Sequence, residues 1–197
     1  MKLKTLFALT VALTPIFASA QVSQSIKDSE KTLFKIQQLS IIKFITPVLM
    51  KKSQINALLT TIEKCRAKEL EIRELDAKKL KEIDADVDKA IESSINDGSY
   101  PKAEFQKKLI VLQEAILIRR KIATGEMVDM MLDTCRKTLD AGQMNVIKNL
   151  IDPKFVDGSI KVDQMTDDEK IKLYIRQIFL DGIAYDVLKQ LAKKASE

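Results

Sequence analysis

Apolar residues recur at intervals of three and four along most of this chain, which is the spacing of an amphipathic α-helix. Residues 25–44 show this pattern first. Thr46-Pro47 then has the form of a helix start, with proline at the first helical position. No proline or glycine follows before Gly98. The pattern therefore predicts one uninterrupted helix of roughly 45 residues, about 65–70 Å long.

A second long helix is predicted after a turn at residues 96–99, and it is expected to end near Thr138. Three shorter helices are expected after it, over residues 139–150, 166–180 and 183–195. No linker separates these parts, so we expect one all-α domain over residues 21–197. Its centre would be a long antiparallel helical hairpin with shorter flanking helices.

The two long helices differ in how much apolar surface they can bury. Between Arg66 and Lys79 the first is mostly charged, so only a narrow stripe of it can be buried. The second is apolar nearly all round at residues 109–112 and 115–118. Such a helix either lies at the centre of a bundle or presents its spare face to another molecule.

Residues 1–20 have the pattern of a cleavable secretory signal. A positively charged start precedes an apolar run that is too short to span a bilayer. Ala18-Ser19-Ala20 then supplies the small residues that signal peptidase requires. We therefore expect cleavage before Gln21 and a secreted mature chain in an oxidising compartment. An ordinary apolar N-terminal helix is the alternative.

Composition and charge argue against nucleic-acid binding and against a membrane span in the mature chain. Removing the signal leaves about 177 residues, enough for one domain with a core. The net charge of +5 falls to +3, because Lys2 and Lys4 leave with the signal. Acidic and basic residues are interleaved and aromatic residues are few, so nucleic-acid binding is not expected. No other apolar run approaches about 18 residues, so no membrane span is expected after cleavage.

The residue types that most enzymes need are missing from the sequence. There is no histidine, the commonest general base near neutral pH and the commonest metal ligand. Two cysteines cannot form a closed zinc site unaided, and the glycines are too scattered for a phosphate-binding loop. We therefore expect a protein that is not an enzyme, with no catalytic residue, metal site or cofactor.

One short motif occurs three times. A large apolar residue precedes a polar stretch that ends in Gln or Glu and opens an amphipathic run. The three copies begin at Met50, Leu139 and Met165 and end at Gln54, Gln143 and Glu169. Physically this is an N-cap with a Gln or Glu at the third helical position and a hydrophobic anchor before it.

This pattern is similar to the LTxxQ motif of the Spy and CpxP family, whose members are small all-helical proteins of the bacterial periplasm. Met50 and Gln54 take the places of the motif's Leu and Gln in the first copy, and Leu139 and Gln143 take them in the second. Lys51 and Asp140 replace its Thr. The third copy keeps the Thr, as Thr166, and ends in Glu169. Generic helix capping, unconnected with any family, would give the same pattern.

The resemblance implies a periplasmic protein that acts in the envelope stress response. Spy-like members are ATP-independent chaperones built on a cradle-shaped helical dimer, and CpxP-like members modulate stress sensing. Adaptable methionines flanked by cations would suit acidic, partly unfolded clients. The candidate client-binding residues are Lys107, Lys108, Arg119, Arg120, Lys121, Met127, Met130 and Met131. Core methionines and a solvated basic face are the alternatives.

The expected partners are therefore proteins, either unfolded clients or one envelope protein, and a homodimer is an open possibility. A non-enzymatic helical scaffold or adaptor of the bacterial envelope is the second hypothesis. A carrier of an apolar ligand between the helices is the third, although no pocket signature can be identified in the sequence.

The two cysteines, Cys65 and Cys135, predict a disulfide between the long helices. If the turn centres near Gly98, Cys65 lies 33 residues before it and Cys135 lies 37 residues after it. That mismatch is about one helical turn, which a modest stagger between the helices would absorb. Two buried free thiols and an intermolecular bridge are the alternatives.

Overall fold

The computed structural model describes residues 24–151 and 162–195, and all regular structure within them is helical. This confirms the all-α prediction. The expected signal at residues 1–20 lies outside the described residues, so its cleavage stays a prediction. The chain divides into two units, Met1–Ile36 and Gln37–Glu197. The boundary falls inside α1 (Gln24–Ile45), and its last turns, with Ile41 and Ile45 buried, belong to the second unit.

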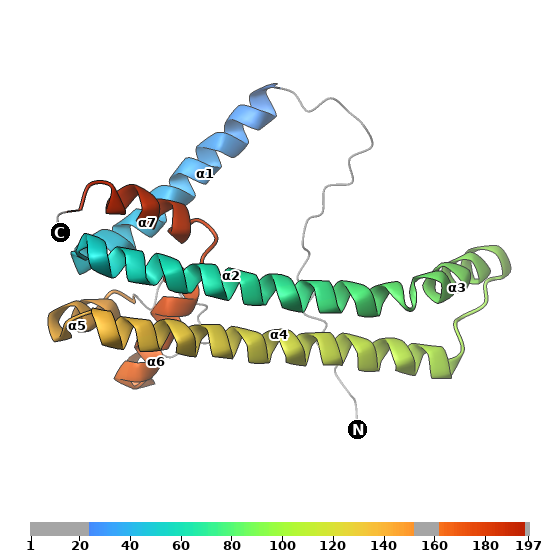
Figure 1. Cartoon of the computed structure of the whole chain (residues 1–197). Coiled ribbons are helices and arrows are strands. Elements are labelled where there is room, and N and C mark those ends of the chain that lie inside the picture. Colours follow the sequence, from blue (N-terminus) through green and yellow to red (C-terminus); the bar gives the residue numbers. More distant parts are fainter. Residues whose placement is uncertain (1–23, 152–161, 196–197) are drawn as a thin grey trace. The chain divides into compact units, whose positions relative to one another are not determined.

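Two long helices, α2 (Lys52–Lys81) and α4 (Ala103–Thr138), lie side by side and run in opposite directions (Figure 1). Hydrogen bonds fix their register at two places. Thr61 and Thr134 share a hydroxyl–hydroxyl bond of 2.9 Å. Further along, Arg119 of α4 donates to Asp76 of α2. Residues of the two helices that face each other therefore have numbers that add up to about 195.

The predicted single helix from Thr46 to near Gly98 is wrong, because the chain breaks it twice. The first break comes at its start, where Thr46–Val48 is a 3-10 turn and Leu49 adopts a left-handed conformation with φ 51°. The Thr46 hydroxyl donates back to the Ile42 carbonyl of α1, 2.8 Å away, instead of capping a new helix. Burial of Val48 fixes this turn against the core.

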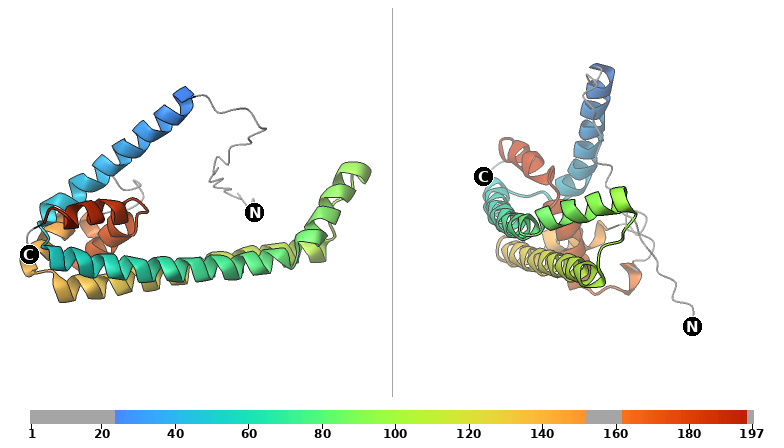
Figure 2. Two further views of the ribbon diagram at one scale, coloured as in Figure 1. Left: turned by 45° about the horizontal axis from the view of Figure 1, so that its top comes forward. Right: turned by 90° about the vertical axis from the view of Figure 1, so that its right-hand side faces the viewer.

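The second break comes at Glu82-Ile83, between α2 and α3 (Asp84–Asp97). Three lysines occupy the last turn of α2, and two aspartates occupy the first turn of α3. Both charge patterns complement the helix dipoles, so they favour an end and a new start at this point. Figure 2 shows α3 turning away from the line of α2. Gly98 then ends α3 with φ 63°, a left-handed C-cap that favours glycine.

Three shorter helices follow: α5 (Ala141–Asn149), α6 (Asp167–Tyr174) and α7 (Ala184–Ala192). A π-helical turn at Ile175–Phe179 prolongs α6, so the predicted helix over 166–180 is present with an irregular end. Arg66 anchors α7 to α2, because its guanidinium lies 4.2 Å from the centre of the Tyr185 ring.

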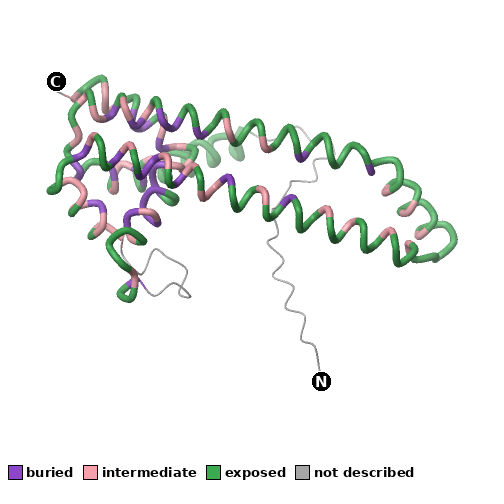
Figure 3. Tube along the Cα trace, turned by 60° about the horizontal axis from the view of Figure 1, so that its bottom comes forward, coloured by how far each residue is buried: buried purple, intermediate pink, exposed green. Residues whose placement is uncertain are grey.

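Buried side chains concentrate at one end of the α2–α4 pair, where α5, α6 and α7 lie (Figure 3). We call this cluster the core. Its fully buried members include Leu58, Met131, Ile147, Phe179 and Leu188. The remaining stretch, residues 66–125, which spans the rest of α2, α3 and most of α4, we call the arm. Few side chains of the arm are buried, and many large apolar ones are exposed.

Candidate functional site

The first motif copy forms half of a capping box at the start of α2, because the Lys51 side chain has no acceptor. The backbone N–H of Lys51 donates to Gln54 Oε1 over 2.8 Å, as its position three residues into the helix predicts. The other end of the same amide reaches a distant helix: Gln54 Nε2 donates to the Thr138 carbonyl over 2.7 Å. Gln54 therefore joins the start of α2 to the last residue of α4.

The second copy repeats this arrangement at the start of α5. The backbone N–H of Asp140 donates to Gln143 Oε1 over 3.0 Å, and the Asp140 carboxylate accepts from the Gln143 backbone N–H over 2.8 Å. Gln143 Nε2 donates across to the Leu49 carbonyl over 3.2 Å. Leu49 and Thr138 each lie one position before their own motif copy, so the two cross-connections are equivalent.

The two side-chain amides also bond directly to each other. Gln54 Nε2 donates to Gln143 Oε1 over 2.9 Å, and Gln143 Nε2 donates back to Gln54 Oε1 over 3.0 Å. Each amide oxygen thus accepts twice and each amide nitrogen donates twice, which uses both groups fully. We call this arrangement the glutamine clamp. Sequence reasoning predicted both capping roles but missed the pairing, since capping patterns carry no information about contacts between segments far apart in sequence.

The remaining motif residues have local roles. Leu139 is buried and Met50 is half-buried against the core, as hydrophobic anchors. Thr166 and Glu169 cap α6 without joining the clamp: the Thr166 backbone N–H donates to Glu169 Oε2 over 2.8 Å. That bond, with a second from the Thr166 hydroxyl, holds the pKa of Glu169 below its usual range. The structure therefore unites two of the three copies.

The candidate client-binding residues separate into three groups. Lys107, Lys108 and Lys121 are exposed on the arm. Met127 and Met130 are half-buried, whereas Met131 is fully buried in the core and offers no surface to a client. The third group, Arg119 and Arg120, binds a carboxylate of α2.

That carboxylate, Asp76, is only 1% exposed although it lies in the most charged stretch of α2. Arg119 donates to its Oδ1, and Arg120 Nε donates to its Oδ2 over 2.7 Å. Burial alone would raise the pKa of Asp76, but the hydrogen bonds and positive charges of the two arginines outweigh burial and lower it. Sequence reasoning missed this residue, because only the helix register reveals which of many carboxylates faces Arg119 and Arg120.

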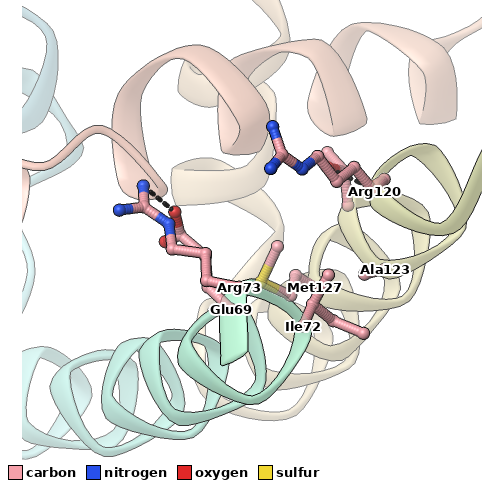
Figure 4. Close-up of a pocket in the computed structure, with 7 residues that line it drawn as sticks. Glu69, Ile72, Arg73, Arg120, Ala123 and Met127 are labelled. Atoms are coloured by element: carbon pink, nitrogen blue, oxygen red, sulfur yellow. Dashed lines mark hydrogen bonds and ion pairs between the residues drawn. The ribbon is translucent and has the colours of Figure 1, made fainter. Parts of the chain in front are cut away.

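A pocket of about 420 Å³ opens beside this ion-pair cluster, between α2 and α4 (Figure 4). Ile72, Ala123 and Met127 form its apolar lining. Arg73 of α2 and Arg120 of α4 also line it, from opposite helices. Arg73 is bound to Glu69 on its own helix, with an N–O distance of 2.6 Å.

The predicted disulfide is not formed: Cys65 and Cys135 are both free, buried thiols. The register explains why, because Thr61 faces Thr134, which leaves the two cysteines five residues out of step. Five residues are about 7.5 Å along a helix axis, more than the Cα separation of most disulfides. The Cys65 thiol instead donates to the Met127 carbonyl, 3.8 Å away. Burial raises the pKa of Cys65, and it raises the pKa of Cys135 to about 12.

Within residues 24–151 and 162–195, none of the helices combines the length and the apolar character that crossing a bilayer requires. Comparison of the chain with protein-family models, with curated proteins and with solved structures finds no match.

Proposed function

We propose that this protein is a periplasmic, ATP-independent chaperone or envelope-stress modulator of Spy/CpxP type, and that it is not an enzyme. In this proposal the arm holds unfolded or partner proteins, and the core with its glutamine clamp is the rigid base of the arm. The glutamine clamp supports the resemblance, because it gives the two aligned motif copies one shared structural role.

The observation that carries the proposal is the number of large apolar side chains exposed on the arm. Those of α4 alone are between 54% and 67% exposed: Ile110, Val111, Leu117, Ile118 and Ile122. Scattered exposed apolar residues are common, but five of them between residues 110 and 122 of one helix mark an interaction surface. Lysines between them, such as Lys107, Lys108 and Lys121, would attract acidic clients.

Aggregation of client proteins tests this proposal. Two unrelated proteins, one unfolding on heating and one on reduction, are followed by light scattering with equimolar purified protein and no nucleotide. We expect the protein to suppress both. Exchanging Ile118 and Ile122 for serine should remove at least half of the effect without destabilising the fold, because both side chains are exposed.

A matched control comes from α1. Leu33 is 59% exposed, like the two isoleucines, but it lies in the first unit, outside the arm. Leu33→Ser should therefore leave suppression unchanged. Equal losses in this variant and in the double variant would contradict a role for the arm, and no suppression by the wild-type protein would reject the chaperone proposal.

A specific spacing on α4 favours the scaffold as a second candidate. Val111, Ala115, Ile118 and Ile122 are all exposed and follow one another at intervals of four, three and four residues. This is the seam spacing of a helix that packs against one other helix. A scaffold would suppress no aggregation, would bind one envelope protein from its own cell through this seam, and would lose that binding in the double serine variant.

A further inference from the structure

The pocket between α2 and α4 combines features that a simple apolar surface lacks. Ile72, Ala123 and Met127 supply an apolar lining, and Arg73 and Arg120 bring two guanidinium groups to it from facing helices (Figure 4). Its volume of about 420 Å³ lies within the range of ligand pockets.

The charges around this pocket do not cancel. Three guanidinium groups, from Arg73, Arg119 and Arg120, face two carboxylates, from Glu69 and Asp76, so the cluster has one surplus positive charge. Arg120 uses Nε for Asp76, which leaves its two Nη nitrogens for another acceptor. Guanidinium groups bind carboxylates with two parallel hydrogen bonds, so a carboxylate is the complementary ligand group.

We propose that this pocket binds an acidic side chain of a client polypeptide, together with an apolar side chain close to it in the client sequence. The proposal rests on the chaperone function argued above and names the segment that the arm selects. The client carboxylate would bind between Arg73 and Arg120, and the apolar side chain would lie on the arm beside them.

Exposed apolar side chains beyond the pocket favour a polypeptide over a small amphiphile such as a fatty acid. Leu117 lies one helical turn from Arg120 on α4 and is 67% exposed. The helix register places Leu80 of α2, which is also exposed, near the same level. One helical turn is about 5 Å, and successive side chains on one face of an extended peptide are about 6.6 Å apart. An apolar residue two positions from the acidic one therefore fits this spacing.

Fluorescence anisotropy with two labelled peptides tests the proposal. One peptide repeats Glu-Ser-Leu-Ser, which places a Leu two positions from each Glu on the same face of an extended chain, and the other has Gln in place of every Glu. We expect the wild-type protein to bind the Glu peptide at least fivefold more tightly at low salt. Arg73→Gln should weaken binding of the Glu peptide at least threefold and leave the Gln peptide unaffected. Glu69→Gln should tighten it about threefold, because it releases Arg73.

The matched control is Lys79→Gln. Lys79 is a cation of α2 that is paired to a nearby carboxylate, Glu82 at the C-cap of the helix, much as Arg73 is paired to Glu69. It lies six residues further along α2 and does not line the pocket. Its exchange should change neither affinity. Equal losses in the Arg73 and Lys79 variants would show general charge attraction and overturn the proposal.

Two further results separate this inference from the proposed function. Displacement of the Glu peptide by decanoate at equal concentration would assign the pocket to a fatty acid and overturn the proposal. Aggregation suppression by a protein that does not distinguish the two peptides would overturn the pocket assignment but leave the chaperone function intact. If the protein distinguishes the two peptides but does not suppress aggregation, the chaperone function is rejected and the selectivity of the pocket for acidic peptides is retained.

Discussion

The core and the arm hold the same two helices together by different means. At the core, α2 and α4 are joined by buried apolar side chains such as Leu58 and Met131 and by the glutamine clamp. Along the arm, ion pairs also join the two helices: Asp76 binds its two arginines, and Lys68 binds Glu126 where the arm meets the core. Apolar packing resists separation because it excludes water, whereas an exposed ion pair such as that of Lys68 with Glu126 contributes little. We therefore expect the arm to open locally at a lower free energy than the core.

The largest expected effect comes from removing a core side chain. Phe179 is fully buried, and its ring meets Tyr174 edge-on at a centroid distance of 5.2 Å. Phe179→Ala should cost about 3–5 kcal/mol of the free energy of unfolding, measured in urea. The arm variant Ile118→Ala should stay within about 0.5 kcal/mol, because that side chain is already exposed. Similar losses in both variants would remove the distinction between core and arm.

Asp76→Asn should lower the local stability of the arm and leave that of the core unchanged. The change removes the negative charge from a buried group that accepts from two arginines, a loss of about 1–3 kcal/mol. Hydrogen exchange is the measurement: amides of residues 66–81 and 112–123 should exchange faster, and core amides of α5 and α7 should be unchanged. Uniformly faster exchange would mean that the arm and the core unfold as one unit.

The same ion-pair cluster predicts a pH dependence. The arginines lower the pKa of Asp76 in the folded protein below its ordinary value of 3.8. Its contribution to stability is therefore complete above pH 3.8 and is lost as the pH falls through the lowered folded value. The stability difference between wild type and Asp76→Asn should be constant from pH 5 to 7 and should shrink at lower pH. A difference that persists undiminished into strong acid would contradict the charge-based account.

The two residues of the glutamine clamp should contribute to the free energy of unfolding as a coupled pair. Gln54→Ala and Gln143→Ala should each cost about 0.5–2 kcal/mol, the usual size of a lost cap. Because each amide is the other's partner, the double variant should cost less than the two losses added together, with a coupling of at least about 0.5 kcal/mol. Thr166→Ala, which removes the separate cap of α6, should instead be additive with either. Strict additivity of the two glutamine variants would mean that each residue only caps its own helix.

The features that were predictable from the sequence are the ones that local residues determine. The all-helical fold follows from apolar periodicity, the turn at Gly98 from a glycine in an Asn-Asp-Gly-Ser stretch, and the caps at Gln54 and Gln143 from residues three positions apart. The break at Ile83 was not predicted, although the charges around it indicate a helix end. Lysines occupy the last turn before the break, and aspartates occupy the first turn after it. A helix end that depends on charge needs neither proline nor glycine.

The site was less predictable, because its contacts join residues far apart in the sequence. Gln54 and Gln143 meet across 89 positions, and Asp76 meets Arg120 across 44. A register error of one residue in the α2–α4 pair would place a different carboxylate beside the arginines. The disulfide prediction failed for this reason: it expected a mismatch of four residues that a modest stagger would absorb, whereas the register puts the offset at five.

Small effects are expected at two glycines, Gly98 at the end of α3 and Gly125 inside α4. Gly125 lies inside α4, and a Cβ built there meets nothing within 4 Å, so Gly125→Ala should stabilise the protein by about 0.5–1 kcal/mol. Gly98 has equally free space but a φ of 63°, so Gly98→Ala should cost about 1 kcal/mol at the tip of the arm. Hydrogen exchange should show faster exchange in α3 alone for the Gly98→Ala variant, because no core contact depends on that turn. Thermal unfolding of both variants gives the sign of each stability change. Stabilisation by both substitutions would mean that free space at the Cβ, rather than backbone conformation, controls both positions.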